Sequence, residues 1–471
     1  MPAPVHVHWF RHDLRLKDNP ALAAAAKEGS VLCIYIHQNH FSKKHIPGEA
    51  RQWWTHHSLA SLNKSIDNKL AFYSGDPADV FKNILERFPI ASVHFNEAAS
   101  AHQRQTDQSI EKLLSEQDIE CTIHSGCTLW PIGEILKDDG TPYRVFTPFF
   151  KKGCLKAEPP RLPMRAPSLS LVHDKFALSL TECGILPTHA WTKKMNPHWE
   201  IGEAGAHKQL KRFIQHGLQG YKEGRNFPAQ EHVSRLSPHL QYGEISPNTV
   251  WYAAQEAGDS DDIQHFLSEL GWREFSYQLL FHNPKLAEKN LQSKFDAFPW
   301  SKSAKKLTAW QKGLTGIPIV DAGMRELWAT GYMHNRVRMI VGSFLVKNCL
   351  LDWRDGERWF WDCLVDADAA NNSASWQWIA GCGADAAPYF RIFNPVTQGQ
   401  KFDPDGDYTR HWVPELAKCP DLYLFNPWEA PTDLLSQAGI ILGKTYPEPI
   451  VDLKASREEA LAAFQSLKNN G

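Results

Sequence analysis

The chain has 471 residues, of which 42% are hydrophobic and 22% charged, a balance that excludes a disordered or fibrous protein. Because hydrophobic cores rarely grow beyond about 250–300 residues, we expect two or three domains. The 51 lysines and arginines nearly balance the 53 acidic residues, and the net charge of −2 excludes a protein that is positive all round, so that any contact with nucleic acid needs a local patch.

The first 130 residues alternate short β-rich runs with helical stretches. The predicted strands are 5–10, 31–37, 70–74, 91–96 and 121–129, and the predicted helices are 21–27, 50–66, 77–87 and 103–115. This strict alternation predicts a doubly wound parallel sheet. No G-x-G-x-x-G motif follows the first strand. A charged loop, residues 11–15, stands instead at its carboxyl end, where sheets of this kind bind ligands.

The rest of the chain changes character twice. Residues 131–204 are rich in proline and basic side chains and are predicted to form a long surface connection. Beyond residue 205 helical signals dominate: Ser246 before Pro247 predicts a helix start and Gly258 its end, and Ser237 before Pro238 repeats the start signal. We therefore predict an α/β domain over 1–130, a linker over 131–204 and a large all-α domain over 205–471.

The nine cysteines are scattered and never spaced C-x-x-C, which indicates buried thiols in a reducing compartment and no disulfide framework or metal site. The start of the chain has no basic stretch followed by an apolar run, and no segment has 18 uncharged apolar residues. We expect a cytoplasmic protein with no membrane span.

Three segments of the helical region, 269–273, 335–339 and 366–378, place polar and aromatic residues on single helix faces. Each alone is more simply an amphipathic surface helix, but the three together favour a polar-aromatic pocket. In that pocket Asp366 and Arg338 could form a buried ion pair, or else an ordinary exposed one. Residues 233–238 open a helix with two hydroxyls, which suits either a phosphate or a plain helix cap. The 18 tryptophans are more than packing usually requires, although a buried tryptophan is most often core.

The chain resembles the photolyase/cryptochrome family, and within it the microbial class I cyclobutane pyrimidine dimer (CPD) photolyases. The resemblance runs from Trp9 to Phe402 and is most specific in GIPIVDAGMR (316–325), MHNRVRM (333–339) and NNSASWQW (371–378). It implies an α/β domain, a linker and a helical domain that binds FAD. The implied activity is that of a deoxyribodipyrimidine photo-lyase, which flips the dimer out of damaged DNA and splits it by electron transfer from photoexcited FADH⁻.

By the same resemblance, FAD folds into a U within the helical domain. Asn372 matches the position that faces flavin N5, where plant cryptochromes carry aspartate, and so favours repair over signalling. Val233 stands where relatives often have threonine. The implied FAD contacts are Tyr221, Val233, Ser234, Arg235, Leu236, Ser237, Phe266, Arg338, Asp366, Ala367, Asp368 and Asn372.

The resemblance also implies how the lesion is held. Trp272 and Trp378 form aromatic walls, Glu269 and Asn335 hydrogen-bond the dimer, and Met339 packs on its ring. Further contacts to DNA are implied for Arg225, Arg273, Arg336, Arg391, Gln398 and Lys401. Trp376, Trp353 and Trp300 match the family's photoreduction triad, with Trp376 nearest the flavin and Trp300 nearest solvent.

A second, antenna chromophore is expected but not identified, because His102 and Gln103 replace the asparagine–glutamate pair of folate-using relatives and residues 51–59 also differ. Methenyltetrahydrofolate, 8-hydroxydeazaflavin, FMN and none at all stay open. The expected partner is UV-damaged DNA, bound by a monomer without an obligate protein partner.

Three alternatives are weaker. A cryptochrome-like photoreceptor fits poorly with Asn372 and the lesion-pocket residues. A (6-4) photolyase needs paired active-site histidines, whereas His334 points away by helical phase and is expected to be structural. A DASH-type enzyme lacks support because its pocket substitutions are absent.

Overall fold

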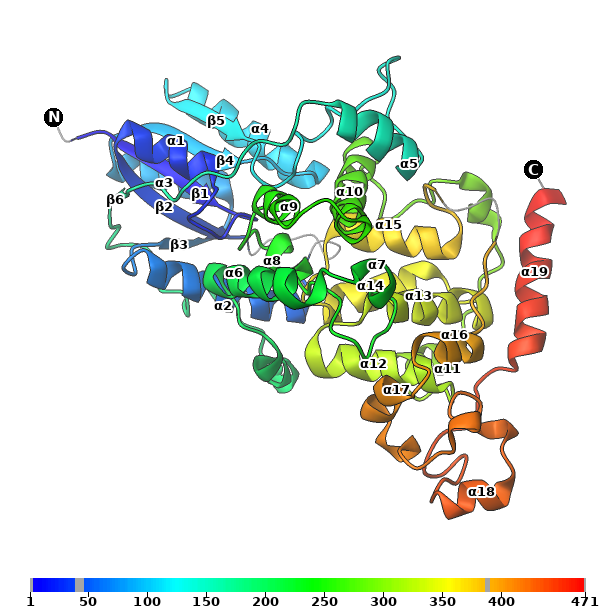
Figure 1. Ribbon diagram of the computed structural model, residues 1–471. Helices are drawn as coiled ribbons and strands as arrows, with labels where there is room; N and C mark the ends of the chain where they lie inside the picture. The colour runs from blue at the N-terminus through cyan, green and yellow to red at the C-terminus, as the bar shows by residue number, and fades with distance from the viewer. Residues whose placement is uncertain (1–2, 39–45, 386–389, 470–471) are drawn as a thin grey trace. The chain divides into compact units, whose positions relative to one another are not determined.

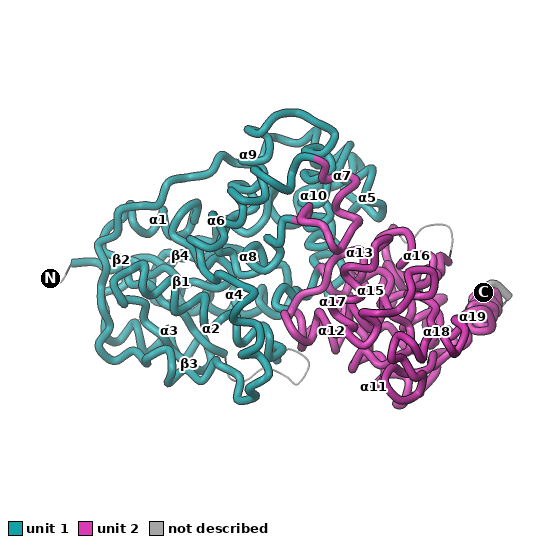
Figure 2. The backbone as a smooth tube through the Cα atoms, turned by 60° about the horizontal axis from the view of Figure 1, so that its bottom comes forward, with its two compact units in different colours: residues 1–219, 234–284, 365–370 teal, residues 220–233, 285–364, 371–471 magenta. Residues whose placement is uncertain are grey.

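The computed structural model describes residues 3–38, 46–385 and 390–469. They form two compact units, coloured separately in Figure 2: unit 1 contains residues 1–219, 234–284 and 365–370, and unit 2 contains residues 220–233, 285–364 and 371–471. This division groups the predicted linker and residues 205–219 and 234–284 of the predicted helical domain with the sheet. It therefore cuts across the domain ranges expected from the sequence, which stay predictions.

Unit 1 is built on a parallel sheet with the strand order β3-β2-β1-β4-β5 (Figure 1). The strands are β1 (Val5–Phe10), β2 (Ser30–His37), β3 (Ala71–Ser74), β4 (Ile90–Asn96) and β5 (Glu120–His124). Because the order reverses between β1 and β4, the doubly wound prediction is confirmed.

Two strand predictions need correction. The predicted strand 121–129 is too long, because β5 ends at His124 and residues 125–129 leave the sheet. The predicted surface connection is partly a strand, because β6 (Ser170–Leu171) pairs with β2 in parallel, Ser30 opposite Ser170. A two-residue strand carries no periodic signal that sequence could show.

Helices cover both faces of the sheet. Val7 and Trp9 of β1 pack in one core with Phe81 of α3 (Pro77–Arg87) and Ile110 of α4 (Ala101–Ser115). Phe10 points to the other face, into a core that includes residues of α1 (Pro20–Glu28) and α2 (Glu49–Ser65). Burial on both faces explains why β1 is apolar or buried at every position.

The other α-helices of unit 1 are α5 (Phe146–Pro148), α6 (Glu203–Arg212), α8 (Ser237–Gln241), α9 (Pro247–Glu256) and α10 (Asp261–His282). Those of unit 2 are α7 (Tyr221–Gly224), α11 (Ala304–Gln311), α12 (Pro318–Thr330), α13 (Asn335–Ser343), the π-helix η6 (Phe344–Asn348), α14 (Trp353–Cys363), α16 (Pro395–Phe402), α17 (Asp407–Trp412), α18 (Thr432–Gln437) and α19 (Leu453–Asn469). Helix α15 (Ala369–Ala380) has residues in both units.

The predicted helix starts are confirmed in one case and shifted in the other. Ser246 caps α9, since its hydroxyl accepts from the Thr249 N–H at 2.9 Å. Ser237 is the first residue of α8 and not its cap, and its hydroxyl donates to the Asp366 carboxylate at 2.6 Å. The side chain is thus used for a distant contact and not for the local one.

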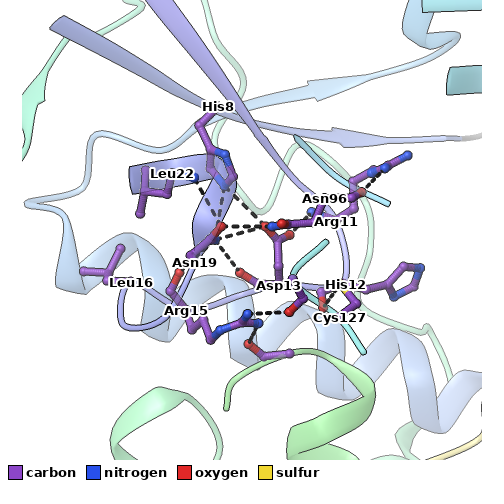
Figure 3. A network of polar contacts seen from close by, with 12 residues as sticks. His8, Arg11, His12, Asp13, Arg15, Leu16, Asn19, Leu22, Asn96 and Cys127 are labelled. Carbon is purple, nitrogen blue, oxygen red and sulfur yellow. Dashed lines mark hydrogen bonds and ion pairs between the residues drawn. The ribbon is translucent and has the colours of Figure 1, made fainter. Parts of the chain in front are cut away.

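The charged loop after β1 is a structural hub (Figure 3). Asp13 is 1% exposed and accepts from the Asn19 and Asn96 amides at 3.0 and 2.7 Å. Arg15, equally buried, donates to the carbonyls of Gly126 (2.7 Å) and Gly243 (3.0 Å). The buried side chains of Asp13 and Arg15 therefore hold the fold together through internal hydrogen bonds and are not available to a ligand.

This hub predicts a large stability effect. Burial opposes ionisation of Asp13, but its hydrogen bonds from His8 and the Arg11 backbone outweigh burial and hold the pKa of that carboxyl well below its usual range. Asp13→Ala should destabilise unit 1 by about 3–5 kcal/mol, because it leaves buried donors without their acceptor. Wild-type stability from this group is present above pH 3.8 and is lost as the pH falls below it. Urea denaturation measures the change, with the exposed Asp138→Ala as control; equal midpoints for both variants would contradict it.

All nine cysteines are free thiols, and all except Cys121 are buried. Across the described ranges no helix is long and apolar enough to cross a membrane. In the same part of the chain no three His, Cys, Asp or Glu side chains are grouped so that they could hold a metal ion.

Candidate functional site

In the loop that leads into α8 of unit 1, a residue with left-handed backbone conformation is followed by one with right-handed conformation. Arg235 has a φ of +52°, in the left-handed region, and Leu236 after it is right-handed (φ −87°, ψ −7°). Successive residues of opposite hand turn backbone N–H groups to one side, an arrangement that binds anions. The Gln209 amide holds the Ser234 carbonyl at 2.7 Å, so the turn is anchored. The backbone geometry suits a phosphate group, but the Leu236 N–H already donates to the Ser234 hydroxyl at 3.3 Å, and the implied phosphate contact stays a prediction.

Two carboxylates of unit 1 lie close to hydroxyl groups. Asp366 accepts from Ser237 at 2.6 Å, and Asp368, 6% exposed, accepts from Tyr277. Burial and the Asp368 charge raise the pKa of Tyr277 above its usual range, so the phenol stays a donor. Asp368 precedes α15 and does not lie on the helix face predicted for it. Carboxylates held in this way can accept hydrogen bonds from the hydroxyl and amino groups of a nucleotide.

Helix α10 carries four of the predicted side chains, including Arg273. Phe266 is buried, with its ring 4.7 Å from that of Phe213. Glu269 is partly exposed, and its carboxylate lies 3.8 Å from the His265 ring nitrogen. Trp272 stacks on Phe146 with ring centroids 3.8 Å apart and an interplanar angle of 11°. That contact fixes the plane of the indole, as an aromatic wall requires.

Arg273, predicted to contact a DNA phosphate, is engaged inside unit 1. Its guanidinium donates to the Cys127 carbonyl at 2.9 Å and to the Glu274 carboxylate at 3.2 Å, and its side chain is 11% exposed. Burial raises the pKa of Glu274 to about 7. Part of the guanidinium is therefore engaged inside unit 1, and the phosphate contact of Arg273 stays a prediction.

In unit 2, Asn372 is oriented by a residue that sequence reasoning missed. Its amide nitrogen donates to both the backbone carbonyl of Glu357 (3.0 Å) and the Glu357 carboxylate (3.1 Å). The Ser373 hydroxyl donates to the same carboxylate at 3.2 Å. Both amide protons are thereby taken, and the carbonyl oxygen of Asn372 is left as an acceptor for an N–H group.

Glu357 should make stability depend on pH. Burial raises the pKa of its carboxyl from 4.5 to about 6, against the hydrogen bonds from Ser373 and Asn372. Its favourable contribution is complete below pH 4.5 and is lost as the pH rises to about 6. Glu357→Gln keeps an acceptor for Asn372 but cannot ionise, so above that range it should be about 2 kcal/mol more stable than wild type, with no difference below pH 4.5.

Denaturant titrations at both ends of that range measure the effect. The exposed Glu458→Gln serves as control and should match wild type throughout. A pH-independent difference between Glu357→Gln and wild type would show that ionisation of Glu357 is not the cause.

Helix α13 presents the second predicted segment. Asn335 is exposed at its start, and Met339 is half-buried. Arg336 donates to the Asn226 side chain, and its guanidinium lies 4.3 Å from the Phe402 ring. His334 is the N-cap, and its ring accepts from the Arg336 N–H at 3.2 Å, so the expectation that this histidine is structural is confirmed.

Arg338 and Tyr221 also belong to unit 2. The Arg338 guanidinium donates to the Met333 carbonyl at 2.7 Å, and Tyr221 is buried with the Arg225 guanidinium 5.4 Å from its ring. The ion pair predicted between Arg338 and Asp366 stays a prediction.

The three tryptophans predicted to form the triad lie in unit 2, each in or near helix α14. Trp353 is the first residue of α14 and is fully buried, and its indole donates to Asn290 at 2.9 Å. Trp376 packs against Gly356 of α14 so closely that a Cβ there would lie 2.2 Å from its ring. Trp300 is half-buried, and the residue after it pairs with Leu351 just before α14. Trp376 (3% exposed) and Trp353 (0%) are buried and Trp300 is partly exposed, and the order of electron transfer among the three stays a prediction.

The remaining predicted DNA contacts lie in one stretch of unit 2. Arg391 and Lys401 are exposed, and Gln398 and Trp378 are half-buried. Asn394 caps α16 by accepting from the Val396 N–H at 2.9 Å. The stretch therefore places two cations at the surface.

Known families match both parts of the chain. Residues 6–168 match DNA photolyase, and residues 266–466 match the FAD binding domain of DNA photolyase. A deoxyribodipyrimidine photo-lyase of Agrobacterium fabrum is 47% identical over 99% of this chain and 98% of its own length. The chain belongs to the DNA photolyase family. The predicted enzyme class is confirmed at that level, and the FAD-binding domain supports FAD as the cofactor.

The chain is also similar to photolyases and cryptochromes of several classes. A class III photolyase from Agrobacterium tumefaciens superposes with a TM-score of 0.94 at 47% identity, covering 100% of this chain and 98% of its own. The class I expectation is therefore not confirmed. Cryptochrome-2 of Arabidopsis thaliana is 36% identical over 96% of this chain and 77% of its own length. An archaeal photolyase from Sulfolobus tokodaii (TM-score 0.84, 28% identity, covering 98% of this chain and 100% of its own) has two FAD molecules, with the implication of a novel light-harvesting cofactor.

Proposed function

We propose that this photolyase-family protein is a light-dependent CPD photolyase that works with reduced FAD, FADH⁻. The observation that carries the proposal is the orientation of Asn372: Glu357 takes both of its amide protons, so its oxygen is left to accept from an N–H group. Reduced flavin has an N–H at N5, whereas oxidised flavin does not. Asn372 therefore suits the reduced form.

The residues that would hold FAD are those predicted from the sequence, and their chemistry fits. The turn at Ser234–Ser237, with successive residues of opposite backbone hand, would face the pyrophosphate. Asp366, which accepts from the Ser237 hydroxyl, and Asp368 offer acceptors to the nucleotide's hydroxyl and N–H groups. Bound reduced FAD supplies the light-excited electron that opens the cyclobutane ring. The further proposed contacts are Tyr221, Val233, Phe266, Arg338, Ala367 and Asn372.

The lesion would be held by side chains on α10, α13 and α15. Trp272, fixed by its stack on Phe146, and Trp378 offer aromatic faces; Glu269 and Asn335 offer hydrogen bonds; Met339 offers an apolar surface. A dimer stacks and pairs poorly in the duplex, so turning it outward is less costly than turning out normal bases. The proposed phosphate contacts are Arg225, Arg336, Arg391 and Lys401, with Gln398 beside them.

We assign the protein to the class III branch instead of class I, because of the identity that it shares with a class III photolyase along its whole length. We also propose that an antenna chromophore accompanies FAD, drawn from methenyltetrahydrofolate, 8-hydroxydeazaflavin and FMN. Two residues of the predicted antenna segments already have partners in the fold. The Gln103 amide nitrogen lies 2.7 Å from a ring nitrogen of His12, and the buried Trp54 indole donates to the Glu244 carboxylate at 3.0 Å. Chromophores extracted from the purified protein and separated by chromatography identify the antenna, and recovery of FAD alone contradicts it.

Repair of defined lesions tests the function. The chemically reduced protein is mixed with a duplex that carries one CPD and, separately, with one that carries a (6-4) photoproduct, each in blue light and in darkness. We expect restored pyrimidines only for the CPD and only in light. Binding without repair would favour a cryptochrome-like photoreceptor, and repair of the (6-4) photoproduct would overturn the CPD assignment.

A further inference from the structure

A lysine side chain lies in the interior of unit 2. Lys347, in the π-helix η6, is 1% exposed, and its four neighbours in η6 are buried as well. Within the described ranges no carboxylate lies at ion-pair distance from its amine. A buried lysine without a counter-ion is unfavourable, so its amine is expected to have a specific task.

The contacts of the amine all lead to one segment. The Lys347 nitrogen donates to the backbone carbonyl of Arg391 at 3.4 Å and lies 3.5 Å from the centroid of the Phe390 ring. Phe390 itself stacks on Phe464 of α19, with centroids 4.5 Å apart. The positive charge is thus met by a carbonyl dipole and an aromatic face.

A second buried side chain holds the same segment. Residues 390–394 have no regular secondary structure, so no helix or sheet ladder fixes their backbone. The Ser343 hydroxyl, at the end of α13, accepts from the Phe393 N–H at 3.2 Å and is 1% exposed. Lys347 and Ser343 therefore hold the backbone of this segment from the interior, while the Arg391 side chain is exposed to solvent.

Burial makes the lysine costly. It lowers the pKa of Lys347 to about 7. A methionine would fill the same volume without that desolvation. The amine is therefore retained despite its effect on stability, which is typical of groups kept for function.

We propose that Lys347 is a positioning residue for DNA binding: its buried amine holds the backbone of residues 390–393 so that Arg391 meets a phosphate of the damaged duplex. This inference rests on the proposed function. Lys347 touches neither DNA nor cofactor, and it acts through the carbonyl of Arg391 and the ring of Phe390.

Lys347→Met tests the proposal in the FAD-loaded full chain. Affinity for a duplex with one CPD should fall about tenfold, and the slope of log K against log salt should be reduced by about 1, the value of one lost phosphate contact. The flavin spectrum should be unchanged, and the thermal midpoint should be equal to or higher than that of wild type. A merely structural lysine would instead lower the midpoint and leave the salt slope as it is.

A double-mutant cycle makes the assignment specific. Arg391→Ala should reproduce the loss of affinity and slope, and Lys347→Met added to it should cause little more, because both remove the same contact. The exposed Lys444→Met, which loses the same charge, should bind as wild type does. If Lys347→Met is insoluble, Ser343→Ala replaces it as the test, because it removes the other anchor of the segment and should likewise reduce the salt slope.

Wild-type affinity and slope in Lys347→Met, or losses that add fully to those of Arg391→Ala, overturn the positioning role. Failure of the proposed function is a different result: the wild-type protein itself then shows no preference for the CPD duplex, and the inference falls with it.

Discussion

Trp376→Phe is expected to abolish the light-driven reduction of oxidised FAD while sparing repair by chemically reduced protein. Trp376 is the proposed proximal electron donor. It is 3% exposed and packs on Gly356, one helical turn from Trp353. Phenylalanine keeps most of the packing but is far harder to oxidise than tryptophan. Once the flavin has been reduced chemically, this donor is no longer needed.

The measurement is the bleaching of the oxidised flavin bands under blue light with an external reductant. Trp412→Phe, a half-buried tryptophan of the same unit outside the triad, is the matched control and should bleach as wild type does. Unchanged bleaching in Trp376→Phe would refute the triad assignment. Loss of repair by the chemically reduced variant would instead place Trp376 in the repair step.

Glu269→Ala is expected to weaken the binding of CPD-containing DNA about ten- to hundredfold. The carboxylate lies on the same helix as Trp272 and is only partly exposed, so its hydrogen bond to the lesion would form away from bulk water. A hydrogen bond to a charged group contributes about 1.5–3 kcal/mol, and each 1.4 kcal/mol is a factor of ten. The flavin spectrum should not change.

Binding is measured by titrating the labelled CPD duplex, and the repair yield is measured in parallel. Glu269→Gln keeps a hydrogen-bonding side chain and should recover part of the affinity, whereas the exposed Glu256→Ala should behave as wild type. Wild-type affinity and yield in Glu269→Ala would remove this residue from the proposed lesion site.

The sequence predicted helices and strands correctly where the hydrophobic pattern and the start signals of a segment indicate the same element. Residues 5–10 and 77–87 are β1 and α3 as predicted, because an apolar run and an aspartate–proline helix start are local signals. The faces of α10 and α13 were also predictable, since residues three and four apart must lie together on a helix.

Long-range partners could not be predicted in the same way. Nothing in the residues around Arg273 shows that the Cys127 carbonyl accepts from its guanidinium, and nothing near Asn372 points to Glu357. Lys347 was missed for a related reason: it stands in an apolar run as a single charge, and only the fold brings the Arg391 carbonyl to it. Such contacts depend on tertiary packing rather than on spacing.

The most direct test is a spectrum of the purified protein, followed by blue illumination of the same chemically reduced sample with ultraviolet-irradiated oligothymidylate. We expect flavin absorption bands at the outset, and a steady recovery of the ultraviolet absorbance of the bases that stops in darkness. A colourless protein that stays inert toward this substrate even after reconstitution with FAD would contradict the account.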